Sequence, residues 1–424
     1  MNEQQFSNID GRFNLHYLAT DKFKTNLVQI YFMLPLRTEK EAAMNALIPA
    51  ILRRGSENYP DNQLIKTELE NLYGSAINFN ILKRGENQLL RFSLEMVNEK
   101  FLSHRSDLTK KAFQLLNDLI FRPVLENNKF KQKYFEQEKE VLKNNIEALI
   151  NDKYSYTIEN CIKKMCSREK YGIYKLGSIE ELAKIENEEL FAHYKKIIKQ
   201  AKMSLFLVGN FKRKFIDDIF EQSLLPASSE IVDDNTELLY REKEAEYYQT
   251  ELKLNQARLS MGYRTGITRN STAYYALLVF NSLLGGSTHS KLFQEVREKR
   301  SLAYYVSSSI ETTKGLLFIN SGINSANSKK VENLTQEQLA KIAAGDFSEE
   351  EFSRSKKSII NSLKQDLDSN KALAAHFLLS LINNKEESIN ATIKQVEQIK
   401  RSDLIKVAKK LRLDTIYLLK GKDD

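Results

Sequence analysis

Residues 27–35 read LVQIYFMLP, a run of β-branched, aromatic and aliphatic side chains that is typical of a buried strand. A second run with strand character, ARLSMGY, occupies residues 257–263, at an offset of 229 from residues 28–34. Each run is followed by a helical pattern, then by paired strands, further helices and a final strand. The order therefore predicts that the chain contains two copies of one fold.

Three further pairs of segments extend the repeat. Gly74-Ser75-Ala76 matches Ser301-Leu302-Ala303 at an offset of 227, and IENEELFAHYKKI (185–197) matches IKRSDLIKVAKKL (399–411) at 214. LFLVG, which ends at Gly209, matches IYLLKG, which ends at Gly421, at 212. The offset falls steadily, as deletions in the second copy would cause. Chance similarity between generic segments is the alternative, and four matches in order argue against it.

The repeat predicts the fold class and the domains. Each copy is expected to be an α+β domain, with a mostly antiparallel sheet and helices packed on one face. We place an N-terminal domain at residues 12–220, a linker at 221–253 and a C-terminal domain at 254–422. The linker contains the last proline of the chain, Pro226, and is rich in charged residues.

Composition narrows the possible functions. A length of 424 residues is enough for two or three domains with sizeable cores. The net charge of +8 comes mostly from lysines interleaved with glutamates, a pattern that favours a solvated surface over a nucleic-acid site. The first ten residues lack the features of a secretory signal, and no apolar run is long enough to span a membrane. We therefore expect a cytoplasmic protein with no nucleic-acid or membrane partner, in which Cys161 and Cys166 are reduced thiols.

The chain lacks the motifs of common catalytic sites. Its five histidines are His16, His104, His193, His289 and His376, and none has another histidine three or four residues away. The zinc motifs H-E-x-x-H and H-x-x-E-H are absent, as are the G-x-S-x-G elbow and the P-loop. Lone histidines are usually structural, so none of these five is predicted to bind a metal.

One stretch carries a specific resemblance. Residues 289–309 read HSKLFQEVREKRSLAYYVSSS and follow the turn Gly285-Gly286-Ser287. Together with the repeat, this stretch resembles the pitrilysin/insulinase family of inverted-motif zinc peptidases, in which a glycine turn precedes a similar helix and strand. The segments ENLYGSAINFN (from Glu70) and VNEKFL (from Val97) are similar to the bacterial YmfF-like subgroup. The resemblance covers essentially the whole chain.

The resemblance implies where a zinc site would lie in the first copy. In the family, H-x-x-E-H follows the first strand, and a downstream glutamate is the third ligand. Counting back from Gly55-Ser56 places the motif at Ala46, Pro49 and Ala50, and the third ligand position is Asn145. The three metal ligands and the general base are therefore missing, although a supporting glutamate position keeps Glu138. We expect no metal cofactor in this chain and no hydrolysis by this half alone.

The second copy keeps a family signature. In the family, an arginine and a tyrosine seven residues apart approach the substrate carbonyl, and they correspond to Arg297 and Tyr304 here. A guanidinium and a phenol can both donate hydrogen bonds to a developing oxyanion. From periodicity alone, Arg297 belongs to a charged helix face and Tyr304 is an ordinary strand aromatic. The resemblance favours the functional interpretation of the pair.

These features predict a non-catalytic subunit of a two-chain zinc peptidase. Its partner would be a zinc-bearing H-x-x-E-H paralogue in a heterodimer, or a second copy in a homodimer. The chain would bind an extended peptide along a sheet edge and supply Arg297 and Tyr304 in trans, so it would contribute to peptidase activity only with the partner. Two alternatives remain open: a peptide-binding or scaffold protein with no peptidase partner, and an active peptidase with an unusual site.

Overall fold

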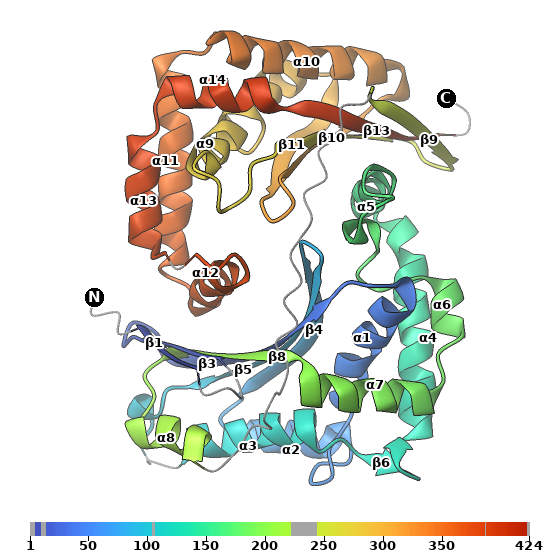
Figure 1. Ribbon diagram of the computed structural model, residues 1–424, viewed down its shortest axis with the longest axis vertical. Helices are drawn as coiled ribbons and strands as arrows, with labels where there is room; N and C mark the ends of the chain where they lie inside the picture. The colour runs from blue at the N-terminus through green and yellow to red at the C-terminus, as the bar shows by residue number, and fades with distance from the viewer. Residues whose placement is uncertain (1–4, 10–13, 104–106, 222–243, 386, 422–424) are drawn as a thin grey trace. The chain divides into compact units, whose positions relative to one another are not determined.

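The computed structural model describes residues 5–9, 14–103, 107–221, 244–385 and 387–421. They form two compact units, each built around one large sheet (Figure 1). Unit 1 lies within the ranges Met1–Glu147, Ile173–Asn235 and Asp368–Ala375. Unit 2 lies within Ala148–Gly172, Thr236–Leu367 and His376–Asp424.

Unit 1 is a six-stranded sheet in the order β1-β2-β8-β3-β5-β4, in which only β2 and β8 pair in parallel. Its strands are β1 (Gln5–Ile9), β2 (Asn14–Ala19), β3 (Thr25–Pro35), β4 (Ala76–Arg84), β5 (Asn87–Val97) and β8 (Lys202–Gly209), with a hairpin of β6 (Leu125–Glu126) and β7 (Lys129–Phe130) outside the sheet. Its helices are α1 (Glu39–Leu52), α2 (Asn62–Asn71), η1 (Glu99–Phe101), α3 (Leu108–Phe121), α4 (Gln132–Ala148), α6 (Ile179–Ala183), α7 (Asn187–Gln200) and α8 (Arg213–Glu221).

Unit 2 is a five-stranded sheet in the order β11-β12-β10-β13-β9, in which only β13 and β9 pair in parallel. Its strands are β9 (Glu246–Leu252), β10 (Ala257–Arg264), β11 (Ala303–Glu311), β12 (Leu316–Ile323) and β13 (Arg412–Gly421). Its helices are η2 (Leu149–Asn151), α5 (Lys153–Met165), η3 (Lys170–Gly172), α9 (Tyr274–Leu284), η4 (Phe293–Glu298), η5 (Ser325–Asn327), α10 (Ser328–Ala344), α11 (Glu349–Asp366), most of α12 (Asn370–Ile382), α13 (Ile389–Gln398) and α14 (Arg401–Lys410).

The two sheets have the same topology. Read from the opposite end, the second sheet runs β9-β13-β10-β12-β11, which matches β2-β8-β3-β5-β4 of the first sheet strand for strand. Each matched pair of neighbours also has the same direction, including the one parallel pair. The strand pairs predicted to be equivalent, β3 with β10 and β8 with β13, therefore occupy equivalent places. The predicted repeat and the predicted α+β fold class are confirmed.

Alternation along β3 explains how the first core forms. Val28, Ile30, Phe32 and Leu34 are buried in a cluster with apolar residues of α1, α3 and α7. Residues two apart on a strand share one face, so these four side chains line the face that the helices cover. Asp61 caps α2, since its side chain accepts from the backbone N–H groups of Gln63 and Leu64.

Helix α5 comes from the first half of the sequence and packs on the second sheet. Cys161, Ile162 and Met165 of α5 form a cluster with Phe318 of β12 and Tyr417 of β13. This contact is close, since a Cβ atom added at residue 262 of β10 would lie 2.7 Å from the Met165 sulfur. A side chain at that position would therefore have to displace the Met165 side chain. Both cysteines are buried, and they form no disulfide.

Buried ion pairs fix the chain that follows α5. Arg264 on β10 contacts Glu169 at 2.7 Å and Asp414 on β13 at 2.8 Å, and Lys314 reaches the other Glu169 oxygen at 2.8 Å. All four side chains are at most 5% exposed. Arg264 also donates to the backbone carbonyl of Met165 at the end of α5. Two cations and two anions thus join a first-half segment to two strands of the second half.

The reverse exchange takes place in unit 1. Asn370 at the start of α12 donates to Thr25 on β3 at 3.1 Å and to Glu95 on β5 at 3.3 Å. Lys371 pairs with the same Glu95 at 2.7 Å. A second-half segment therefore binds the first sheet, just as α5 binds the second.

Some elements were not predicted. Strands β1, β2 and β9 and helices α5, α6, α8 and α13 are among the elements that the sequence did not predict. Strand β9 lies inside the predicted linker, 221–253. Its residues 246–252 pair with β13, so they belong to the second sheet. Residues 222–243 of that linker lie outside the described residues. In the stretch 289–309 that carries the family resemblance, the turns from Phe293 to Glu298 are π-helical. None of the helices that the structure describes is both long and apolar enough to span a bilayer.

We predict that Glu169→Gln weakens unit 2. Removing one partner from a buried ion network typically costs about 3–5 kcal/mol, because the remaining charges stay buried. Hydrogen exchange of the backbone amides of β10 and β13 measures the free energy of opening. Glu181→Gln is the control, since Glu181 pairs with Lys184 on the surface and should change this value by only about 0–1 kcal/mol. Unchanged protection of β10 and β13 in Glu169→Gln would contradict the structural role of the network.

Candidate functional site

The candidate site in unit 1 is built on one face of α1. Ala46, Pro49, Ala50 and Arg53 follow the spacing i, i+3, i+4, i+7, which places them on one side of the helix. Pro49 cannot donate the usual helix hydrogen bond, yet α1 continues through it to Leu52. The opposite positions of the helix, including Leu47, pack in the core, and this burial holds the helix together across the proline.

Helix α4 supplies the second wall. Glu138 and Asn145 lie seven residues apart, and both line the same cavity as α1. Glu138 is 1% exposed, and its carboxylate pairs with Arg54, with Arg53 3.8 Å away. The carboxylate therefore joins α4 to the end of α1. Asn145 is exposed.

The cavity has a volume of about 340 Å³. It brings together all four positions that the sequence analysis assigned to the lost zinc site, although they come from two separate helices. Its other walls are strand β4, with Phe79, Asn80 and Ile81, and the loop at Tyr174, Lys175 and Leu176. Strand β4 is the edge of the first sheet, so one long side of the strand is free of a neighbouring strand in the described structure.

The residues in this cavity do not fit a zinc ion. Zinc takes imidazole, thiolate or carboxylate ligands. Ala46, Pro49 and Ala50 have no such atoms, and Asn145 offers only an amide. The one carboxylate, Glu138, is engaged by two arginines. Across the described residues, no group of three histidine, cysteine, aspartate or glutamate side chains could hold a metal ion.

The retained arginine and tyrosine both lie in unit 2. Arg297 is on the π-helical turn η4, with its side chain 44% exposed and its guanidinium 4.7 Å from the centre of the Phe293 ring. Tyr304 is 58% exposed on β11, the edge strand of the second sheet. The register shifts between Ala303 and Tyr305, so Tyr304 is the extra residue of a β-bulge. Bulges and π-turns both redirect side chains, and both are common beside functional sites.

The sequence analysis missed a hydrogen-bonded chain behind α1. Gln88 donates to the carbonyl of Lys175 at 2.7 Å, Asn45 donates to Gln88 at 2.8 Å, and His193 lies 2.7 Å from the Asn45 oxygen. Burial, reinforced by Lys196, lowers the pKa of His193 to about 4. Because these residues are far apart in sequence, no local motif could have revealed the chain. His16 and His376 are also mostly buried with lowered pKa values, and His104 lies outside the described residues.

Comparison with known proteins gives the family. Residues 184–359 match the Peptidase M16 inactive domain. The chain is 35% identical over 418 residues to the "Probable inactive metalloprotease YmfF" of Bacillus subtilis, and the match covers 97% of this chain and 96% of that protein. The chain belongs to the peptidase M16 family. The predicted pitrilysin/insulinase resemblance, including its YmfF-like character, is confirmed.

Other M16 relatives and solved structures agree. The "Uncharacterized zinc protease YmxG" of Bacillus subtilis is 26% identical over 302 residues, 68% of this chain and 69% of that protein. A crystal structure of a conserved protein from Enterococcus faecalis V583 has a TM-score of 0.90 at 27% identity and covers 99% of both chains. A peptidase M16 inactive domain from Pseudomonas fluorescens shares the fold, with a TM-score of 0.81 at 18% identity over 100% of this chain and 99% of that one. This chain is thus an inactive-type M16 member.

We predict that rebuilding the zinc motif requires both helices. Ala46→His, Pro49→Glu and Ala50→His together supply two ligands and a base, but α4 still lacks the third ligand. Adding Asn145→Glu should tighten zinc binding by at least about tenfold, since even outer-shell partners of a metal site are worth that much. Competition with a chromogenic chelator measures the affinity. Equal affinity of the triple and quadruple variants would show that residue 145 does not face the site, and stoichiometric zinc in the natural chain would refute the loss of the site.

Proposed function

We propose that this chain is the non-catalytic subunit of a two-chain M16 peptidase. In this proposal it binds an extended peptide and supplies Arg297 and Tyr304 to the active site of a zinc-bearing H-x-x-E-H partner. The observation that carries the proposal is that the first half has lost its family site residues while the second half has kept them. The metal positions of the first half hold residues that cannot bind zinc, while the donor pair of the second half is kept on exposed positions.

The setting of Tyr304 supports a role as a hydrogen-bond donor. An ordinary strand tyrosine gains stability by burying its ring, but Tyr304 is more than half exposed. Its neighbour Tyr305 is the aromatic that packs, with its ring 5.5 Å from the ring of Tyr154 and 5.6 Å from the Arg258 guanidinium. The bulge thus separates a packing tyrosine from an exposed one. An exposed phenol on an edge strand can reach a substrate carbonyl and stabilise developing negative charge.

The edge strands support peptide binding. An extended peptide can add to an unpaired strand edge through backbone hydrogen bonds, while side-chain pockets provide selectivity. Strand β4 is such an edge in unit 1, and the cavity at the lost zinc site lies beside it. A peptide on β4 would meet Arg53 and Lys175 in place of a metal ion. This chain would then hold the peptide without cleaving it.

We also propose that the chain lies in the cytoplasm and forms a heterodimer. Two buried cysteines that form no disulfide suit a reducing compartment, which favours the cytoplasm. A heterodimer with a zinc-bearing paralogue fits the losses in this chain better than a homodimer, because two copies of this chain would contain no zinc ligands.

We predict that Tyr304→Phe lowers peptide turnover by the reconstituted pair by about 10²–10³-fold. The change keeps the ring and removes only the hydroxyl donor, and a preorganised oxyanion donor is typically worth this factor. Tyr247→Phe is the matched control, since Tyr247 is 52% exposed on β9 and should leave turnover unchanged. Size-exclusion chromatography of each variant with the zinc-bearing chain checks assembly. Full turnover by the assembled Tyr304→Phe pair would favour a scaffold, and loss of assembly would make the tyrosine an interface residue.

A further inference from the structure

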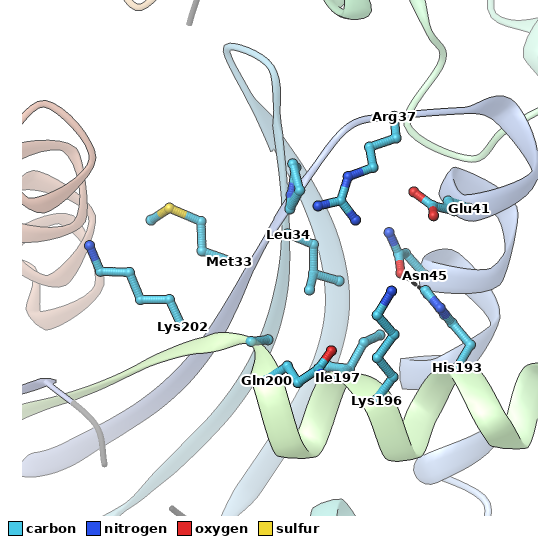
Figure 2. Close-up of a pocket in the computed structure, with 12 residues that line it drawn as sticks. Met33, Leu34, Arg37, Glu41, Asn45, His193, Lys196, Ile197, Gln200 and Lys202 are labelled. Atoms are coloured by element: carbon cyan, nitrogen blue, oxygen red, sulfur yellow. Dashed lines mark hydrogen bonds between the residues drawn. The ribbon is translucent and has the colours of Figure 1, made fainter. Parts of the chain in front are cut away.

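A second pocket lies on another side of α1 from the degenerate zinc cavity. It has a volume of about 200 Å³ and lies entirely within unit 1, between the end of β3, the first turns of α1, helix α7 and the start of β8 (Figure 2). Glu41 and Asn45 of α1, four residues apart, line it, whereas the zinc-site positions line the other cavity. Drug-sized ligands occupy roughly 300–1,000 Å³, so this pocket suits a single residue or a small anion.

The lining of the pocket is positively charged. It contains three basic side chains, Arg37, Lys196 and Lys202, against one acidic side chain, Glu41. Figure 2 shows the Arg37 guanidinium and the Lys196 amine directed toward the same region beside Asn45, while Lys202 lies apart from them. Within the described part of the chain, neither lysine has a carboxylate partner. An arginine and a lysine facing one region form a favourable site for a carboxylate.

The third polar group is a histidine whose proton position is fixed by its neighbours. Gln88 uses its amide nitrogen to donate to the carbonyls of Ala42 and Lys175, so its oxygen must accept from Asn45. The Asn45 oxygen then accepts from Nε2 of His193. In a neutral imidazole, a proton on Nε2 leaves Nδ1 as an acceptor. The chain of bonds therefore assigns Nδ1 as the group that can accept from a ligand N–H.

His193 is neutral near pH 7 mainly because it is buried. Burial is the main cause that lowers its pKa to about 4, and Lys196 and Arg37 lower it further, while Glu189 on the same helix acts in the opposite direction. Glu189 is itself paired with Lys40 at 2.7 Å. A bound anion would offset the two cations, while a ligand N–H that donates to Nδ1 would favour the neutral ring.

The remaining wall is apolar. Met33, Leu34 and Pro35 at the end of β3, together with Ile197 and Ala201 of α7, contribute aliphatic surface. A ligand that matches the whole pocket has a carboxylate for the cations, a neutral N–H for His193 and a short aliphatic group for this wall. A free fatty acid lacks the N–H, and the ammonium group of a free amino acid would face Arg37 and Lys196.

We propose that this pocket binds the C-terminal residue of a peptide, with its free carboxylate at Arg37 and Lys196 and an aliphatic side chain against the apolar wall. The backbone N–H of that residue donates to Nδ1 of His193. The proposal rests on the proposed function only in taking a peptide as the source of the ligand. It requires no zinc-bearing partner, so it is tested on the purified full-length chain alone.

Isothermal titration calorimetry with N-acetyl-leucine is the direct test. N-acetyl-leucine should bind at least tenfold more tightly than N-acetyl-leucinamide, which lacks the charge, and than N-acetylglycine, which lacks the aliphatic group. Lys196→Gln should weaken binding at least tenfold, while Lys195→Gln should not. Both lysines are exposed on α7, and Lys195 lies over the Phe191 ring outside the pocket, so neither change disturbs the core.

Histidine NMR gives a second readout that a nonspecific charge effect would not produce. On binding N-acetyl-leucine, the ¹⁵N signal of Nδ1 of His193 should shift as this atom accepts the ligand N–H, while Nε2 stays protonated. The signals should be assignable because the chain has only five histidines. Equal binding of acid and amide, no binding at millimolar ligand, or equal effects of Lys195→Gln and Lys196→Gln would overturn the proposal. Free leucine binding as tightly as N-acetyl-leucine would overturn the peptide as the ligand source, whatever the outcome for the partner subunit.

Discussion

The buried contact between Arg264, Glu169, Asp414 and Lys314 is the constraint on which the second unit depends. A lone buried charge is very costly, so each of these four groups is tolerable only because the others are present. Since Glu169 belongs to the first half of the sequence and the other three belong to the second, unit 2 is complete only when both halves are folded. The first sheet likewise binds residues 368–375 of the second half. The two copies of the repeat are thus not independent domains, although their sheets are equivalent.

The exchange of segments between the two halves explains why the sequence could predict some elements and not others. The apolar runs of β3, β8, β10 and β13 were enough to identify the repeat, because a strand buried on both faces leaves a continuous local pattern. Helix α5 left no such signal, since the surface that buries Cys161 and Met165 is formed by strands about 100 to 250 residues later in the chain. Strand β9 is similar, because the pairing with β13 that defines it is non-local.

The candidate site also contains some residues that the sequence could predict and others that it could not. Counting from Gly55 placed Ala46, Pro49 and Ala50 on one helix face, and the structure adds that Asn145 lines the same cavity. The family resemblance identified these positions, whereas composition and periodicity alone would have treated them as ordinary core residues. The chain from Gln88 through Asn45 to His193 could not be predicted, because each bond joins residues more than 40 positions apart. The chain is thus an M16 scaffold without the zinc ligands, in which an exposed arginine and tyrosine and the two cavities beside α1 are present.

In the proposed function, this chain acts by completing a zinc-bearing partner. The most direct measurement is peptide hydrolysis by an H-x-x-E-H homologue from the same organism, titrated with increasing amounts of this chain. We expect little activity from either protein alone, and a rise that saturates at one copy of this chain per zinc-bearing chain. Full activity of the homologue alone, unchanged by addition of this chain, would contradict it, as would hydrolysis by this chain alone.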